Sequence, residues 1–398
     1  MLNNNRKFPQ VWAEIDLNAA AYNVRELRRI TDHNAILMAV VKANAYGHGM
    51  IEIAQTALAN GAEMLGVARL DEGIKIRKTG IKTPVLIFGH TPCELAQKLL
   101  EFDLIQTVSS LDSAVQLSEI ASLNKKKIRV HLKVDTGMGR LGILPPGMLP
   151  DFNISRDKVS CNRALTDVKA MAMLPGLELE GIYTHFATAD YLDKSYARRQ
   201  FKILIDFIEM LYKERIEFKL KHAANSAAII DMPETHLDMV RAGIAIYGLY
   251  PSDNVDKTGI ALKPAMSFKT RIVYLKKVPA GFKVSYGSTY TTKAPTTIAT
   301  ISAGYADGLN RLLSSTKGRV LIRGVTAPII GRICMDLTMV DVGQIPEVKI
   351  NDEVVIFGTQ GDASITVDEI ALKLKTINYE VVSTITDRTK RIYTGLKS

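Results

Sequence analysis

Residues 36–49 read Ile-Leu-Met-Ala-Val-Val-Lys-Ala-Asn-Ala-Tyr-Gly-His-Gly, and the fold prediction starts from this stretch. The apolar run 36–41 is short and is followed by small residues and glycines, which favours a buried strand that ends in a turn. Lys42 comes directly at that strand end. Either its side chain extends into solvent, or it lies at the carboxyl end of a parallel barrel and forms a Schiff base with a carbonyl cofactor.

Short apolar runs alternate with helical patterns on both sides of this stretch. Asp16 can cap a helix that runs to about Ile30, and Gly61 can close a helix over residues 50–59. Eight strands are predicted, over residues 36–41, 64–68, 84–88, 104–108, 128–134, 179–184, 218–222 and 238–241. We therefore expect an α/β fold whose N-terminal part, residues 16–252, is a (β/α)8 barrel of the TIM type.

The pattern changes after about Tyr250. Short β-branched runs separated by Gly, Pro and Lys turns follow, and a single helical segment lies near residues 367–375. The runs are 271–278, 297–301, 320–322 and 353–357. They predict a C-terminal, mostly β domain over residues 253–398, which residues 1–15 could join.

Composition narrows the class of protein. The chain has 398 residues, of which 47% are hydrophobic, and a formal net charge of +10 spread over many segments. This charge favours small anionic ligands, and we expect no nucleic-acid partner. Residues 1–10 are polar, and no apolar run reaches membrane-spanning length, so we expect a soluble, cytoplasmic protein without membrane contact. Three cysteines are too few and too scattered for a disulfide framework or a zinc site, and no metal is expected.

The segment around Lys42 is similar to the pyridoxal-phosphate lysine motif of the bacterial alanine racemases. Further stretches resemble that family along almost the whole chain: Lys133–Arg140, Tyr183–Asp190, Arg241–Ile244, Ser285–Gly287, Gly331–Asp336 and Ile377–Glu380. The resemblance implies a homodimeric enzyme, dependent on pyridoxal 5'-phosphate, that converts L-alanine to D-alanine for peptidoglycan. It also implies active sites shared between the two subunits.

Racemisation needs a base on each face of the substrate α-carbon, because a proton leaves one side and returns on the other. Lys42 can serve one face. Without the resemblance, Tyr286 of the Ser-Tyr-Gly motif is an aromatic residue of a β core. By the family pattern it is the second base, reaches the site from the other subunit, and takes the proton from L-alanine, whereas Lys42 takes it from D-alanine.

The cofactor contacts are expected at the strand ends of the barrel. Asn225 and Ser226 follow the seventh strand, Gly243 and Ile244 follow the eighth, and both turns offer backbone amides that suit a phosphate. Arg241 is assigned by resemblance to the pyridine nitrogen. An arginine there keeps the nitrogen unprotonated, which weakens the electron sink and disfavours transamination.

The remaining site residues follow from the resemblance. It assigns further cofactor contacts to Tyr46, His185 and Tyr379, substrate contacts to Arg140 and the backbone of Met335, a carbamylated side chain to Lys133, and an entry corridor to Gly304–Gly308 and Arg311. Read alone, His185 at a strand end is more often structural. The alternatives are a broad-specificity or serine racemase, a non-catalytic pyridoxal-phosphate carrier, and a decarboxylase of related fold, for which a glycine-rich phosphate loop is missing.

Overall fold

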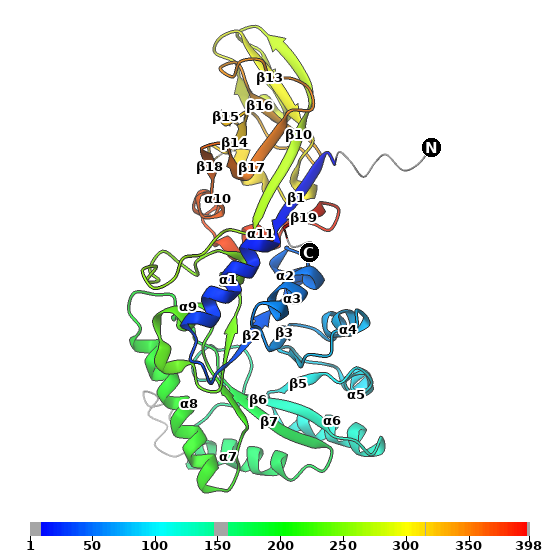
Figure 1. Ribbon diagram of the computed structural model, residues 1–398, viewed down its shortest axis with the longest axis vertical. Coiled ribbons are helices and arrows are strands. Elements are labelled where there is room, and N and C mark those ends of the chain that lie inside the picture. The colour runs from blue at the N-terminus through cyan, green and yellow to red at the C-terminus, as the bar shows by residue number, and fades with distance from the viewer. Residues whose placement is uncertain (1–8, 147–157, 315, 396–398) are drawn as a thin grey trace. The chain divides into compact units, whose positions relative to one another are not determined.

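A computed structural model describes residues 9–146, 158–314 and 316–395, with side chains from residue 163 after the first gap (Figure 1). The contacts divide it into two compact units. The barrel unit consists of residues 19–45 and the described parts of 50–263. The β unit consists of residues 46–49 and the described parts of 1–18 and 264–398. The barrel is thus inserted, in sequence, into the β unit.

Eight parallel strands close the barrel in chain order, from β2 to β9. They are β2 (Ile36–Val40), β3 (Met64–Val67), β4 (Val85–Ile87), β5 (Ile105–Val108), β6 (Ile128–Lys133), β7 (Leu177–Tyr183), β8 (Leu220–His222) and β9 (Met239–Ala242). The last strand pairs with the first, with Ile36 opposite Met239. The predicted (β/α)8 barrel is confirmed.

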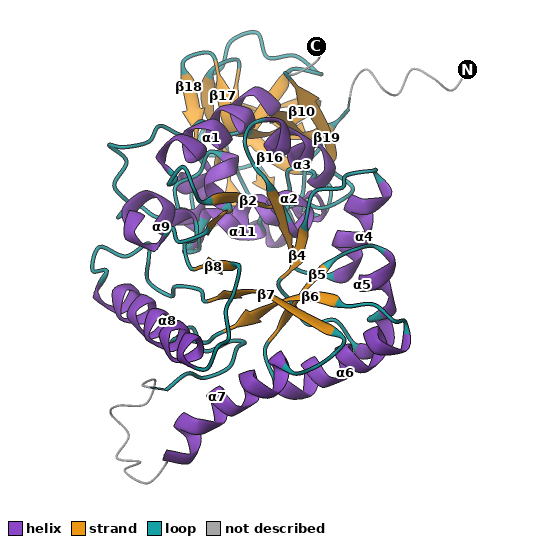
Figure 2. Cartoon of the chain, turned by 60° about the horizontal axis from the view of Figure 1, so that its bottom comes forward, coloured by secondary structure: helices purple, strands orange, loops and turns teal. Residues whose placement is uncertain are grey.

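Helices surround these strands (Figure 2). They are α1 (Leu17–Ile30), α3 (Met50–Ala59), α4 (Leu70–Lys78), α5 (Gln97–Glu101), α6 (Leu111–Leu123), α7 (Lys158–Ala172), α8 (Ser195–Lys213) and α9 (Ser226–Asp231), with 3-10 turns η1 (Cys93–Leu95), η2 (Pro233–Thr235) and η3 (Ile244–Tyr247). The amide of Asn18 donates to the Asp16 carboxylate at 2.8 Å, as a helix cap there requires. No helix in the described chain is both long and apolar enough to cross a membrane.

The barrel interior is filled by one residue from each of several strands. Met38, Met64, Leu86, Ile105 and Met239 form a buried cluster there. Strands covered on both faces have no solvent side, so they are apolar throughout instead of alternating. This is why short continuous apolar runs marked β2 to β4 in the sequence. Burying each such side chain contributes roughly 1.5–3 kcal/mol.

The β unit is built on the long strand β10 (Met266–Val278), which pairs with β1 (Val11–Asp16), β13 (Thr296–Ile301) and β17 (Glu353–Gln360). Its other strands are β11 (Lys283–Val284), β12 (Tyr290–Thr291), β14 (Arg319–Ile322), β15 (Val325–Pro328), β16 (Thr338–Asp341), β18 (Ala363–Ile365) and β19 (Lys390–Thr394). It also contains η4 (Tyr286–Ser288), η5 (Tyr305–Asp307), η6 (Arg311–Ser314), α10 (Val367–Leu374) and α11 (Asn378–Ser383). The predicted mostly β character is confirmed.

The two ends of the described chain meet in this sheet. In Figure 1 the blue β1 lies beside the red β19, and the two pair in parallel, with Trp12 opposite Lys390. Neither strand is among those that the sequence analysis predicts. At the other end of the barrel segment, the side-chain nitrogen of Asn23 on α1 donates to the carbonyl of Lys263. The side-chain oxygen of Asn23 accepts from the amide of Lys263, and both distances are 2.8 Å. The chain up to Lys263 is therefore tied to α1.

Candidate active site

Lys42 lies just beyond the carboxyl end of β2, where the amide of Val41 still donates to Gly66 of β3 at 2.9 Å. Its side chain is mostly buried, and burial, followed by the nearby Arg140, lowers the pKa of the Lys42 amine; Glu72 partly opposes this. A lower pKa leaves a larger fraction of the amine neutral at physiological pH. Attack on an aldehyde requires the neutral amine.

The backbone that follows Lys42 is left-handed. Within α2 (Lys42–Tyr46), the residues Ala43, Asn44, Ala45 and Tyr46 all have φ between 51° and 54°. Each non-glycine residue in this conformation costs about 1–2 kcal/mol. The turn therefore has to be held by its surroundings: the Glu72 carboxylate accepts from the amide of Ala43 at 2.6 Å, and Asn44 accepts from Met50 at 3.0 Å. Strain of this kind concentrates at functional sites.

Tyr46 and Tyr379, two predicted cofactor residues, are neighbours within the β unit. Their ring centroids lie 6.1 Å apart, and burial raises the pKa of the Tyr46 phenol. The segment that carries Tyr46 is fixed to the C-terminal part of the chain. Arg391 on β19 donates to the carbonyl of Gly47 at 3.0 Å, and a Cβ on Gly47 would meet the carbonyl oxygen of Val382 at 2.2 Å.

Arg241 on β9 is fully buried. Its guanidinium donates to Nδ1 of His222 at 2.7 Å and to the carbonyl oxygens of Thr184 and Ala223, each at 2.8 Å. Burial lowers the pKa of Arg241 to about 10, so it stays charged at neutral pH. Its Nη2 lies 3.4 Å from Nδ1 of His185, whose pKa is held well below its usual value by burial and by the charge of Arg241. His185 is therefore neutral.

A chain of buried polar groups continues behind Arg241. Because arginine only donates, Nδ1 of His222 must accept, and Nε2 of His222 then donates to Nδ1 of His131 at 2.9 Å. This leaves the proton of His131 on Nε2, which faces Glu180 at 3.5 Å. Burial lowers the pKa of both histidines. The sequence analysis missed this group, although the position of His131 in the middle of the predicted strand 128–134 was a usable signal.

The turn after β6 is organised by Asp135. Its carboxylate accepts from the backbone amides of Gly137, Met138 and Gly139 through one oxygen, at 2.8–3.1 Å, and from that of Arg140 through the other at 3.1 Å. The turn thereby fixes the backbone at Arg140, a predicted substrate contact. The charge of Asp135 raises the pKa of Lys133, but burial, Arg241 and Arg140 outweigh it.

Lys133 is the last residue of β6, and its ammonium lies 4.3 Å from the centroid of the Tyr183 ring. Burial, and then Arg241 and Arg140, hold the pKa of Lys133 well below its usual value. Thr107 meets the Tyr183 hydroxyl at 2.9 Å, and the Tyr183 ring stacks on His222. Lys133 therefore lies in the same buried cluster as Arg241.

The four predicted phosphate residues lie together. Asn225 caps α9, with its side chain accepting from the amide of Ala228 at 3.1 Å. Ser226 accepts from the amide of Gly243 at 2.8 Å, which joins the start of α9 to the start of η3 at Ile244. Two helical N-termini that meet in this way present backbone amides and partial positive charge to an anion.

These residues suit pyridoxal 5'-phosphate. The barrel unit gathers Lys42, Lys133, Arg140 and Arg241, and burial chiefly lowers the pKa values of Lys42, Lys133 and Arg241, with repulsion from Arg140 as a further cause for each. An anionic phosphate at the helix starts and a substrate carboxylate would relieve that repulsion. A buried lysine of lowered pKa supplies the amine that a cofactor aldehyde requires.

Two predicted residues belong to the surface of the β unit. Tyr286 in η4 is 68% exposed and Met335 is 53% exposed. The predicted corridor segment lies against Met335, because the amide of Tyr305 donates to the carbonyl of Cys334 and that of Ala306 to the carbonyl of Met335, each at 3.1 Å. An exposed tyrosine and methionine on one chain are accessible to a second chain.

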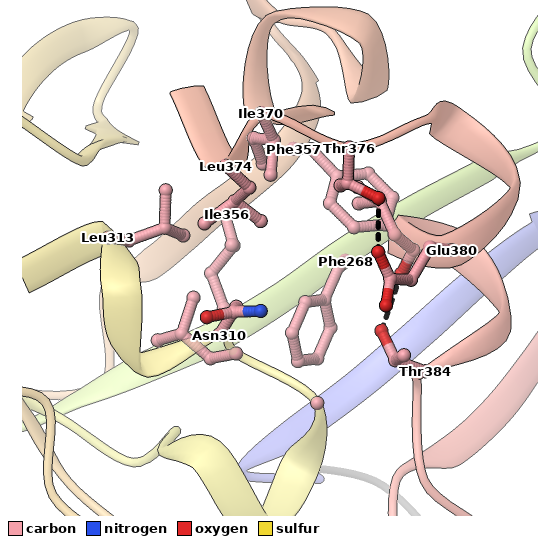
Figure 3. Close-up of a pocket in the computed structure, with 13 residues that line it drawn as sticks. Phe268, Asn310, Leu313, Ile356, Phe357, Ile370, Leu374, Thr376, Glu380 and Thr384 are labelled. Atoms are coloured by element: carbon pink, nitrogen blue, oxygen red, sulfur yellow. Dashed lines mark hydrogen bonds between the residues drawn. The ribbon is translucent and has the colours of Figure 1, made fainter. Parts of the chain in front are cut away.

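The β unit also contains a pocket that includes Gly308 of the predicted entry corridor but none of the predicted catalytic, cofactor or substrate residues (Figure 3). Phe268, Ile356, Phe357, Ile370 and Leu374 make most of its wall apolar. Its carboxylate, on Glu380 of α11, accepts a hydrogen bond from Thr376. With its acidic group already bonded and no cluster of titratable residues, this pocket lacks the groups that racemisation requires.

A buried lysine at the mouth of a parallel barrel, helix starts arranged for a phosphate and an appended β domain define a barrel-type pyridoxal-phosphate enzyme. Residues 15–251 match the model of the alanine racemase N-terminal domain, and residues 265–393 match that of the C-terminal domain. The chain belongs to the alanine racemase family, whose members are isomerases that depend on pyridoxal 5'-phosphate.

Relatives of full length support this assignment. The chain is 55% identical over 382 residues to an alanine racemase of Desulfosudis oleivorans, with 96% of each chain covered. It is 48% identical over 385 residues to that of Desulforamulus reducens, covering 97% of this chain and 99% of the relative.

Solved structures of alanine racemases have the same fold. The alanine racemase of Clostridium difficile superposes with a TM-score of 0.89 at 38% identity, covering 97% of this chain and 96% of the other. The enzyme of Bacillus anthracis with bound L-Ala-P gives a TM-score of 0.87 at 36% identity, with 98% and 96% covered.

Proposed function

We propose that this protein interconverts L-alanine and D-alanine with pyridoxal 5'-phosphate and so supplies D-alanine for peptidoglycan. The observation that carries the proposal is the mostly buried Lys42, with its lowered pKa, at the end of a barrel strand. The family membership of the whole chain agrees with it. The proposal places the enzyme in the cytoplasm, where free alanine and the cofactor are available.

Residues of the barrel unit hold and tune the cofactor. Lys42 would bind it covalently through the amine, and the starts of α9 and η3, at Ser226 and Gly243, would hold the phosphate. When bound, pyridoxal 5'-phosphate would supply an electron-withdrawing ring that acidifies the α-proton of the amino acid. Arg241, which cannot accept a proton, would serve as donor to the ring nitrogen and keep it unprotonated, which disfavours transamination. His185, neutral because of its lowered pKa, would be a further contact of the ring.

Two bases on opposite faces of the α-carbon move the proton. Lys42 takes it from D-alanine, and Tyr286 takes it from L-alanine. A phenol is a poor base at neutral pH, so the assembled site must place positive charge or hydrogen-bond donors beside Tyr286. Arg140 and the backbone of Met335 bind the substrate carboxylate, while Tyr46 and Tyr379 contact the cofactor.

Tyr286 acts in the site of a second subunit, so the active species is a homodimer. Its 68% exposure in one chain supports this proposal, since a catalytic base is expected to be enclosed when the site is complete. Mixing two inactive variants, Lys42→Ala and Tyr286→Phe, tests it. In a mixed dimer one site keeps both native bases, and partial activity returns. Variants that stay inactive after subunit exchange would show that both bases come from one chain.

The activity itself is tested by incubating the protein, cofactor and L-alanine in deuterated water. We expect nearly equal D- and L-alanine, with deuterium on the α-carbon. Tyr286→Phe should keep the absorbance of the bound cofactor but lose roughly 10²–10⁴-fold in turnover, the usual contribution of a positioned base.

Tyr274→Phe is the matched control, because Tyr274 is also an exposed tyrosine of the β unit, on β10. Its turnover should be that of the unmodified protein. Undiminished racemisation by Tyr286→Phe would remove that residue from the mechanism. Bound cofactor without D-alanine would instead overturn the proposed substrate.

A further inference from the structure

We propose that Glu72 is a positioning residue for Lys42: its carboxylate fixes the left-handed turn that begins directly after the lysine, and so sets the direction of the amine. The inference rests on the proposed role of Lys42 in holding the cofactor. Glu72 lies on α4, outside the residues that the sequence analysis singled out.

The carboxylate bridges two segments of the barrel. Oε1 of Glu72 accepts from the amide of Ala43 at 2.6 Å, and Oε2 accepts from the amides of Ala68 at 2.7 Å and Arg69 at 3.1 Å. Hydrogen bonds from amides to an ionised carboxylate are stronger than those to neutral acceptors. One side chain therefore ties the residue after Lys42 to the residues that follow β3.

Helix capping explains only part of this arrangement. Glu72 is the third residue of α4, where a glutamate commonly accepts from the amide of the capping residue, here Arg69. The bond to Ala43 is not needed for capping, because Ala43 belongs to a different segment. Ala43, which donates that bond, is the first residue with positive φ in the turn after Lys42.

The consequence for Lys42 is both geometric and electrostatic. Alanine disfavours left-handed backbone, so loss of the bond to Ala43 allows the turn to relax and the Lys42 amine to change direction. The Glu72 charge also raises the pKa of Lys42, against burial and Arg140. Neutralising Glu72 should therefore lower the pKa of Lys42 further.

The test compares Glu72→Gln with Asp71→Asn. Asp71 is exposed and lies in the first turn of the same helix, so its replacement removes the same charge without affecting Ala43. Peptide-resolved competitive acetylation of the apoprotein across a pH range reports the pKa and reactivity of Lys42. For each variant we also measure the rate of cofactor uptake, followed by absorbance, and the kcat and KM for alanine.

We expect Glu72→Gln to lower the pKa of Lys42, which by itself favours attack on the aldehyde. Cofactor uptake and kcat should nevertheless slow on the order of 10–100-fold, because misplacement of a reacting group has the larger effect. KM should change little, and Asp71→Asn should match the unmodified protein. Glu72→Asp keeps the charge but is too short to span both segments. It should restore the pKa of Lys42 but not the rate of uptake, and it serves as the test if Glu72→Gln does not fold.

The two proposals fail separately. If the unmodified protein racemises alanine while Glu72→Gln behaves like Asp71→Asn in acetylation and uptake, the role of Glu72 is overturned and the function stands. If Glu72→Gln alters Lys42 in the apoprotein but the unmodified protein makes no D-alanine, the positioning role stands and the function is overturned.

Discussion

At the scale of single residues, the site is a group of cations that share a small buried volume. Lys42, Lys133 and Arg241 each have a lowered pKa, chiefly through burial. Such a group is costly without counter-charge. Ligands with a phosphate and a carboxylate provide it, which explains how a strongly unfavourable local arrangement can persist in a folded protein.

Lys133 is expected to react with carbon dioxide. Its lowered pKa leaves a larger fraction of the amine neutral, and a neutral amine attacks carbon dioxide, loses a proton and becomes a carbamate with negative charge. That charge would offset Arg140 and Arg241. With 13C-labelled carbon dioxide, a carbamate signal should appear in the NMR spectrum and disappear in Lys133→Ala. An unmodified Lys133 under saturating carbon dioxide would contradict this.

At the scale of elements, most of the barrel could be predicted because each strand is a local apolar run with its own turn signal. β2, β3 and α3 occur within a residue of their expected bounds. The left-handed turn after Lys42 could not be predicted, since alanine and tyrosine prefer right-handed backbone and nothing local marks the exception. β19 was missed because Lys390 and Arg391 make it look like a surface loop.

The pairing of β6 with β7 gives a prediction for one glycine. A Cβ on Gly181 would come within 2.6 Å of the His131 ring, whereas one on Gly259 would meet nothing within 4 Å. Gly181→Ala should lower the free energy of unfolding by about 1–3 kcal/mol, as overpacking does. Gly259→Ala should raise it by about 0.4–1 kcal/mol by restricting the unfolded chain.

Denaturant unfolding of the apoprotein measures both changes. A second readout belongs to Gly181 alone: nitrogen-15 spectra of labelled histidine should show that the hydrogen bond between His131 and His222 is altered. Equal stability of the two variants would mean that the His131 ring can move aside without cost.

At the scale of the whole molecule, the sequence identified residues but not their assembly. Lys42 and Arg241 could be placed at strand ends because a parallel barrel collects its strand ends on one face. The hydrogen-bonded series of side chains from Arg241 through His222 to His131 could not be predicted, because it depends on which side chains enter the same layer of the barrel interior. Tyr286 shows a further limit, since its proposed site is completed only by a second chain.

Stability should depend on pH through the buried histidines. Burial lowers the folded-state pKa of His131, His185 and His222, so between those values and about 6.5 the unfolded chain binds more protons than the folded one. Their contribution is complete above about pH 6.5 and is lost as the pH falls below it, by about 1.4 kcal/mol per pH unit for each histidine.

Urea unfolding of the apoprotein between about pH 5 and pH 7 checks this dependence. His33→Gln is the control, because the His33 side chain is 88% exposed and its loss should leave the slope unchanged. A free energy of unfolding that does not vary over this range would mean that these histidines are protonated in the folded protein.

The parallel pairing of β1 with β19 has a consequence for synthesis on the ribosome. β1 is made first, but its partner β19 ends at Thr394, so this edge of the sheet cannot form until residues up to Thr394 have been made. The barrel segment, in contrast, is complete by Lys263. Translation thus orders maturation: all the strands that form the barrel beside Lys42 are made well over a hundred residues before β1 receives its parallel partner.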